Sequence, residues 1–159
     1  FSVCGGEIFA HAKLFFFFVS VITYAYTKEQ LAKDKHGNTI NNQYIPAREH
    51  ALNARLDYDR QFTKHYGLNL GLQGRLLSGV HNVEYKDYYD VTKGTVPVAY
   101  PAYTIWKLSI VQRLGDAIKL NAALDNLFGY KPKYYYLNSP ITDGINVQVG
   151  ISIDIDKIF

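Results

Sequence analysis

Apolar and polar side chains alternate at every second position along much of this 159-residue chain, and this repeat restricts its fold more than any other feature. The repeat is clearest near the C-terminus, where the apolar positions are Ile145, Val147, Val149, Ile151, Ile153 and Ile155. A repeat of two residues places alternate side chains on opposite faces of a β-strand. The sequence therefore predicts an all-β, antiparallel protein whose strands each have one apolar and one polar face.

Seven segments are predicted as strands. Five of them have a strong alternating pattern, at residues 48–62, 66–78, 103–114, 118–126 and 144–159. A sixth is expected at about 16–27 and a partial seventh at 5–13. Most of these segments are longer than typical soluble strands, which have about five or six residues. They reach the roughly 9–11 residues with which a tilted strand crosses the hydrocarbon of a membrane.

The connections between these segments alternate between short and long. Residues 63–65 and 115–117 leave room for tight turns, whereas residues 28–47, 79–102 and 127–143 form long connections. Outer-membrane barrels have short periplasmic turns and longer external loops. We therefore predict an antiparallel transmembrane β-barrel segment. A soluble β-sandwich or lipocalin-like binding module is one alternative, because alternation fits any antiparallel sheet with one wet face.

A membrane sheet of six or seven strands is expected to be incomplete. An unpaired strand edge in lipid leaves backbone groups without partners, and bacterial barrels have an even number of strands, at least about eight. The chain begins with Phe1 and contains no Met. We therefore expect residues 1–159 to be the C-terminal portion of a larger barrel. A small self-contained outer-membrane β-barrel, with an eighth strand near the N-terminus, is a second alternative.

One motif near the C-terminus resembles a known family. Residues 125–130 include Asn126, Leu127 and Phe128, and are similar to the box that ends the penultimate strand of TonB-dependent outer-membrane receptors. The resemblance covers about residues 20–159, and residues 131–140 are similar to the Bacteroidetes branch of this family.

The end of the chain carries a second resemblance. Ile151, Ile153 and Ile155 precede the terminal Phe159 at alternate positions, an arrangement that resembles the signal read by the barrel-assembly machinery. Lys157 departs from this pattern, since the family usually has an aromatic or apolar residue there.

The resemblance implies a 22-stranded barrel closed by an N-terminal plug domain, which residues 1–159 do not contain. It implies a location in the cell outer membrane and energy-coupled uptake of a scarce nutrient, such as an iron–siderophore, haem or cobalamin complex. The implied partners are outer-membrane lipid, the barrel-assembly machinery, the TonB complex through the missing N-terminal part, and a small-molecule or metal-chelate ligand.

Each face of the predicted strands has an expected role. The lipid face is expected to comprise Leu52, Leu56, Tyr58, Leu68, Leu70, Leu72, Trp106, Leu108, Ile110, Leu120, Leu124, Val147, Val149 and Ile151. The opposite, lumen face is expected to comprise Arg55, Asp57, Asp59, Arg75, Lys107, Arg113, Lys119, Asp125, Asp154 and Asp156. Two aromatic girdles are expected at the strand ends, formed by Tyr24, Tyr26, Tyr58, Phe62, Tyr66, Tyr103, Trp106 and Phe159.

Aromatic side chains also cluster in two of the long connections. Because the family often contacts ligands through loop aromatics, the ligand-contact candidates are Tyr85, Tyr88, Tyr89, Tyr134, Tyr135 and Tyr136. Packing of these rings within the loops is the alternative interpretation.

Several classes of function have no support in the residues. One Cys excludes an intrachain disulfide framework and a multi-thiolate metal site. The five His residues show no metal-ligand spacing, and the chain contains none of the common catalytic motifs. A net charge of +3 is too weak to indicate a nucleic-acid partner. We therefore expect no enzyme activity, no catalytic residue, no cofactor and no metal.

Overall fold

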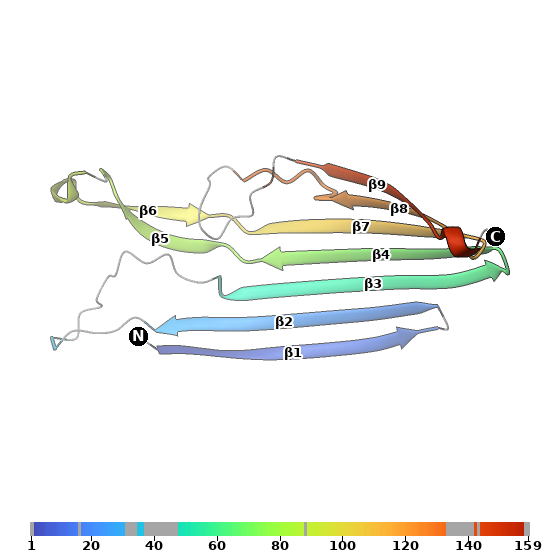
Figure 1. The fold of residues 1–159 in the computed structure, drawn as a ribbon. Coiled ribbons are helices and arrows are strands. Elements are labelled where there is room, and N and C mark those ends of the chain that lie inside the picture. The colour runs from blue at the N-terminus through green and yellow to red at the C-terminus, as the bar shows by residue number, and fades with distance from the viewer. Residues whose placement is uncertain are drawn as a thin grey trace. The chain divides into compact units, whose positions relative to one another are not determined.

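The computed structural model describes residues 2–15, 17–30, 35–36, 48–87, 89–132, 142 and 144–157. These residues form nine β-strands and two 3-10 helices and contain no α-helix, which confirms the all-β prediction (Figure 1). The strands are β1 (Ser2–Leu14), β2 (Phe18–Gln30), β3 (His50–Thr63), β4 (Tyr66–Leu77), β5 (Val80–Tyr85), β6 (Thr95–Tyr100), β7 (Tyr103–Leu114), β8 (Ile118–Asp125) and β9 (Asn146–Ile153). The 3-10 helices are η1 (Val91–Lys93) and η2 (Ile155–Lys157).

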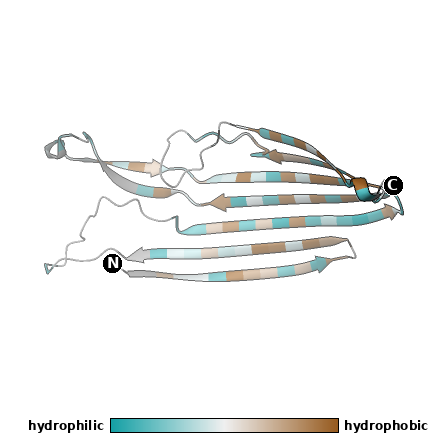
Figure 2. Cartoon of the chain, in the orientation of Figure 1, coloured by the Kyte–Doolittle hydropathy of each residue, from teal (hydrophilic) through white to brown (hydrophobic). Residues whose placement is uncertain are grey.

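Each of the seven predicted segments contains a strand. Strands β1, β2, β3, β4 and β7 have 12 to 14 residues each, as the long alternating segments indicated. Figure 2 shows the alternation directly, since hydrophobic and hydrophilic positions follow one another along β3, β4 and β7.

The hairpin of β5 and β6 was not predicted, because residues 79–102 were expected to form a loop. On β5 the apolar residues Val80 and Tyr85 are an odd number of positions apart and fall on opposite faces, so the alternating pattern is lost. Pro97 within β6 also argues against a strand, since proline cannot donate a ladder hydrogen bond. Pairing with β5 alone leaves one side of β6 in this two-stranded sheet without a partner strand, and proline is tolerated at such an edge.

The last strand is shorter than the predicted 144–159. Strand β8 begins at Ile118, which lies opposite Ile153. Asp154 therefore has no β8 residue to pair with, and the chain turns into η2 at Ile155. Asp154, the residue between β9 and η2, is bonded to the β7–β8 turn, since its N–H donates to the carbonyl of Ala117 at 2.8 Å.

Seven strands form one sheet in the order β1-β2-β3-β4-β7-β8-β9, and β5 and β6 form a second sheet. Strand β8 pairs antiparallel with both β7 and β9. Strands β1 and β9 stand at the two ends of the order, so within the described residues the larger sheet is not closed.

The chain divides into two compact units, each built from several segments. Unit 1 comprises Phe1–Ile8, Tyr24–Leu52 and Leu76–Tyr103. Unit 2 comprises Phe9–Thr23, Asn53–Arg75 and Thr104–Phe159.

Unit 1 contains a small hydrophobic cluster at the base of the β5–β6 hairpin. Leu77, Val80, Tyr100 and Tyr103 are each less than a tenth exposed. The guanidinium of Arg48 lies 4.6 Å from the centre of the Tyr103 ring and donates to the carbonyls of Ser78 and Pro101. Tyr103 is thus a buried packing residue at the hairpin base, and its prediction as a girdle residue was wrong.

The connections β1–β2, β3–β4 and β7–β8, which lie in unit 2, are hydrogen-bonded to neighbouring strands or turns. The N–H of Gly115 donates to the carbonyl of His65 at 2.7 Å, and the N–H of Asp59 donates to the carbonyl of Phe17 at 3.0 Å. Gly115 has a positive φ of 64°, a conformation that glycine adopts without the steric cost of a side chain.

Candidate functional site

The apolar positions of β7, β8 and β9 lie side by side in unit 2. The register places Ile110 opposite Ala122 and Ala122 opposite Val149, so one row of apolar side chains crosses the three strands. Leu108, Leu124 and Val147 form the adjacent row. This arrangement confirms that the predicted apolar positions of these strands share one face.

The apolar side chains of β9 are exposed to solvent. Val147 is 61% exposed, Val149 82% and Ile151 63%. Burial of large apolar side chains is the main source of stability in soluble proteins, and soluble monomers rarely expose contiguous apolar patches of more than a few hundred Å². In the part of the chain that the structure describes, the buried hydrophobic residues are the four at the hairpin base in unit 1.

Trp106 packs over a glycine on this apolar face. A Cβ atom added to Gly74 would lie 2.6 Å from three atoms of the indole ring. The Trp106 ring also meets the Phe128 ring edge-on, with their centres 6.3 Å apart. The missing side chain at position 74 therefore provides the space that the indole ring occupies.

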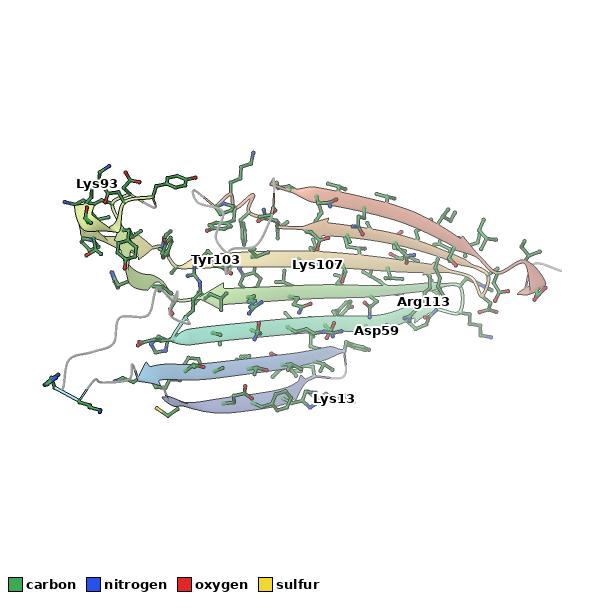
Figure 3. All side chains as sticks on the ribbon, turned by 60° about the vertical axis from the view of Figure 1, so that its left-hand side comes forward. Lys13, Asp59, Lys93, Tyr103, Lys107 and Arg113 are labelled. Carbon is green, nitrogen blue, oxygen red and sulfur yellow. The ribbon has the colours of Figure 1, made fainter. Side chains whose placement is uncertain are left out.

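The opposite face of unit 2 is polar and contains ion pairs. Lys107 pairs with Asp125 at 3.0 Å across β7 and β8, and Arg55 pairs with Asp57 at 2.7 Å along β3. Arg113 of β7 pairs with Asp59 of β3 at 2.5 Å (Figure 3). Several predicted lumen residues are thus brought together as partners.

The Asp59–Arg113 pair crosses a whole strand, because β4 lies between β3 and β7 in the sheet order. Gly67 of β4 makes this crossing possible. A Cβ atom at that position would lie 2.7 Å from Nε of Arg113 and would also collide with the side-chain oxygen of Gln61. No local sequence pattern identifies Gly67, since the need for a glycine there depends on a contact between residues 54 positions apart.

Aromatic rings form separate clusters in the two units. In unit 2 the Tyr58 ring lies 4.8 Å from that of Phe18 and 6.3 Å from that of Phe17, and the Phe62 and Tyr66 rings are 5.7 Å apart. In unit 1 the rings of Tyr24 and Tyr26 each pack against His50, and the Tyr24 hydroxyl is 2.7 Å from Nδ1 of His50. These contacts fit the expected grouping of aromatic residues near the strand ends.

Residues 126–128, which resemble the box of TonB-dependent receptors, take part in a hydrogen-bonded loop closure. Asn126 is 4% exposed and has a positive φ of 55°. Its side-chain N–H₂ donates to the carbonyls of Tyr130 and Gly144 and to the Thr142 hydroxyl, at 2.7 to 3.0 Å. Its side-chain oxygen accepts from the N–H of Tyr130 at 2.9 Å.

The other two box residues have different surroundings. The N–H of Leu127 donates to the carbonyl of Trp106 at 2.8 Å, which ties the box to the start of β7. Phe128 is 70% exposed, with one edge towards Trp106. The box therefore joins the end of β8, the start of β7 and the segment before β9.

Two of the six ligand-contact candidates lie among the described residues. Tyr85 ends β5 and is 38% exposed, and Tyr89 lies just before η1 and is 96% exposed. The candidates Tyr88, Tyr134, Tyr135 and Tyr136 lie outside the described residues. Tyr85 and Tyr89 both belong to unit 1, near the tip of the β5–β6 hairpin.

The hairpin tip is held by charged groups. Lys93, which Figure 3 labels, pairs with Asp87 at 2.5 Å and lies 3.9 Å from Asp90. The hydrogen bond from Lys93, together with that from the N–H of Tyr89, lowers the pKa of Asp87 below its usual value. The carboxylate of Asp90 accepts from the N–H and the hydroxyl of Thr92.

The residues of the proposed assembly signal are exposed where the structure describes them. Ile151 and Ile153 lie on β9, and Ile155, at 66% exposed, begins η2. Phe159 lies outside the described residues.

A polar pocket of about 550 Å³ also lies in unit 2, and sequence analysis did not find it. Its lining residues come from the β7–β8 turn, from β8 and from the region around the end of β9, and are Asp116, Ala117, Lys119, Ser152, Ile153, Asp154, Ile155 and Asp156. These segments meet through the pairing of β8 with β9, which no local motif encodes. Among the described residues, no group of three His, Cys, Asp or Glu side chains could hold a metal ion.

No helix in the described residues combines the length and the hydropathy needed to span a membrane. Comparison of the chain with protein-family models, with curated proteins and with solved structures found no match.

Proposed function

We propose that the chain is part of the membrane-spanning sheet of a TonB-dependent outer-membrane transporter that takes up a scarce nutrient. The observation that carries this proposal is the contrast between the two faces of the unit 2 sheet. One face has exposed Val, Ile and Leu side chains, and the other has ion pairs that link different strands of the sheet.

Exposed apolar rows are unfavourable in water, at about 25 cal/mol for each Å² of apolar surface. The same rows are favourable against lipid chains, and strands of 12 to 14 residues are long enough to cross the hydrocarbon. The ion-paired face would then line a water-filled interior, where charged side chains keep their hydration.

The transport role rests on the resemblance of residues 125–130 to the family box and of the chain end to the assembly signal. In this proposal Tyr85 and Tyr89 contact the ligand outside the membrane, and energy comes from the TonB complex through a plug domain outside residues 1–159. The mechanism is binding and gated passage, without covalent chemistry.

Fractionation of the source cells tests the membrane location. We expect the protein to remain in the membrane pellet after washing at alkaline pH and to require detergent for release. Recovery in the soluble fraction without detergent would instead support a soluble carrier.

Uptake assays test the transport role. Deletion of the gene should lower uptake of one labelled nutrient among ferric siderophores, haem and cobalamin, and the remaining uptake should no longer depend on the proton-motive force. Unchanged uptake of all three classes, with the protein still in the outer membrane, would favour a structural barrel.

A further inference from the structure

Arg60 lies on the side of β3 that also carries Leu52 and Leu56, three residues before the strand ends at Thr63. Asp57 and Asp59 belong to the polar face, because Asp59 pairs with Arg113 (Figure 3). Successive side chains of a strand point to opposite faces. Arg60 therefore shares its face with Tyr58 and Phe62.

Arg60 is placed between two aromatic rings. Its guanidinium carbon lies 4.6 Å from the centre of the Phe17 ring and 4.9 Å from that of Phe62. Phe17 is 37% exposed and Phe62 is 45% exposed, so the rings flank the cation without covering it. Cation–π contacts of this kind restrain the position of the guanidinium group.

The hydrogen-bond donors of Arg60 have no acceptor within the part of the chain that the structure describes. Among the described residues, no side-chain hydrogen bond or ion pair to Arg60 is present, and the neighbouring carboxylate of Asp59 is engaged by Arg113 on the other face. The two ring contacts leave the N–H groups at the rim of the guanidinium free to donate. An arginine with free donors is suited to bind a phosphate through two parallel hydrogen bonds.

We propose that Arg60, flanked by Phe17 and Phe62, is a binding site for the phosphate of an anionic phospholipid headgroup. The inference rests on the proposed membrane location. The site lies next to the short β3–β4 turn, and short turns of outer-membrane barrels face the periplasm. The lipid would therefore belong to the periplasmic leaflet, with the two rings in the interfacial region and the guanidinium at the level of the phosphates.

Binding of the full chain to vesicles tests this site. The wild-type chain and the variants Arg60→Gln, Arg60→Lys and Arg75→Gln would be mixed with vesicles of phosphatidylcholine alone or of phosphatidylcholine with phosphatidylglycerol. Arg75→Gln removes the same charge from the polar face of β4 and is the matched control. Flotation measures the bound fraction, and circular dichroism confirms that each variant retains its β-structure.

The site predicts a specific pattern. Arg60→Gln should weaken binding to vesicles that contain phosphatidylglycerol by about fivefold, the effect of one basic residue at an anionic surface. Arg60→Lys should retain most of the binding, and Arg75→Gln should behave as the wild type. Binding to phosphatidylcholine alone should change little in any variant.

Four outcomes separate the possible failures. Equal loss in Arg60→Gln and Arg75→Gln would mean general charge attraction and would overturn the site. Competition by inorganic phosphate would assign the site to a free anion and not to a lipid. A wild-type chain that binds neither kind of vesicle would contradict the proposed function itself, whereas wild-type binding that Arg60→Gln leaves unchanged would remove this inference alone.

Discussion

At the scale of single residues, Asn126 and Gly74 occupy positions where another residue type would disturb the local structure. Asn126 combines a left-handed backbone conformation with four side-chain hydrogen bonds. Asparagine is one of the few residues with a side chain that adopts this conformation readily, and its amide supplies both donors and an acceptor. The Asn126 side chain therefore links the end of β8 to the segment before β9 through its hydrogen bonds.

The variant Asn126→Asp tests this loop closure. A carboxylate cannot donate to the carbonyls of Tyr130 and Gly144, so the free energy of unfolding should fall by about 1–3 kcal/mol. Urea titration of the chain folded in detergent measures the change. The control is Asn121→Asp, at an exposed position on β8, and an equal effect of the two variants would show that the Asn126 hydrogen bonds contribute nothing specific.

The variant Gly74→Ala tests the packing of the single tryptophan. The added Cβ would lie 2.6 Å from the indole ring, so Trp106 must move. We expect a loss of about 1–3 kcal/mol of stability together with a shift in tryptophan fluorescence. Gly6→Ala is the control, because nothing lies within 4 Å of its added Cβ, and an unchanged emission spectrum for Gly74→Ala would contradict the packing.

At the scale of elements, the β5–β6 hairpin is stabilised by contacts at its base and at its tip. Arg48 and the four buried hydrophobic residues hold its base, and Lys93 with Asp87 holds its tip. Local contacts of this kind can keep a hairpin ordered when its strands lack a consistent apolar face. Tyr85 and Tyr89 are thereby attached to an ordered element, which lowers the entropy cost of binding a ligand.

The ion pair between Asp87 and Lys93 at the hairpin tip should be lost at low pH, when the Asp87 carboxylate is protonated. The pKa of Asp87 is lowered by Lys93, so the folded state favours the carboxylate. Its contribution to stability is present above the usual pKa of 3.8 and is lost as the pH falls through the lowered value. NMR titration of the Asp87 carboxyl should give a midpoint below 3.8, and Lys93→Gln should bring it back up. A midpoint that Lys93→Gln leaves unchanged would exclude the ion pair as the cause.

At the scale of the whole molecule, the proposed function requires that the two faces of the sheet meet different surroundings. Adjacent residues of β8 test this requirement, since Ala122 lies in the apolar row and Asn121 on the polar face. An arginine on a lipid-facing strand near the middle of the bilayer costs about 2–4 kcal/mol. The same residue on the interior face should cost little.

We therefore expect Ala122→Arg to lower the free energy of folding into vesicles by about 2–4 kcal/mol, and Asn121→Arg to change it far less. Denaturant titration in lipid vesicles, followed by tryptophan fluorescence, measures both. Equal effects would mean that the faces do not differ in their surroundings, and a larger effect at Asn121 would reverse their assignment.

The sequence by itself determined the all-β class, the seven strands of the larger sheet and the division of β7, β8 and β9 into two faces. These features follow from a repeat of two residues, which is local and can be read without knowing any partner. The tertiary structure decided the rest. Strand β9 ends where β8 has no further residue to pair, the hairpin of β5 and β6 forms without a regular pattern, and Arg113 reaches Asp59 across Gly67. These features depend on which strands become neighbours, and neighbours distant in the chain leave no periodic signal in its sequence.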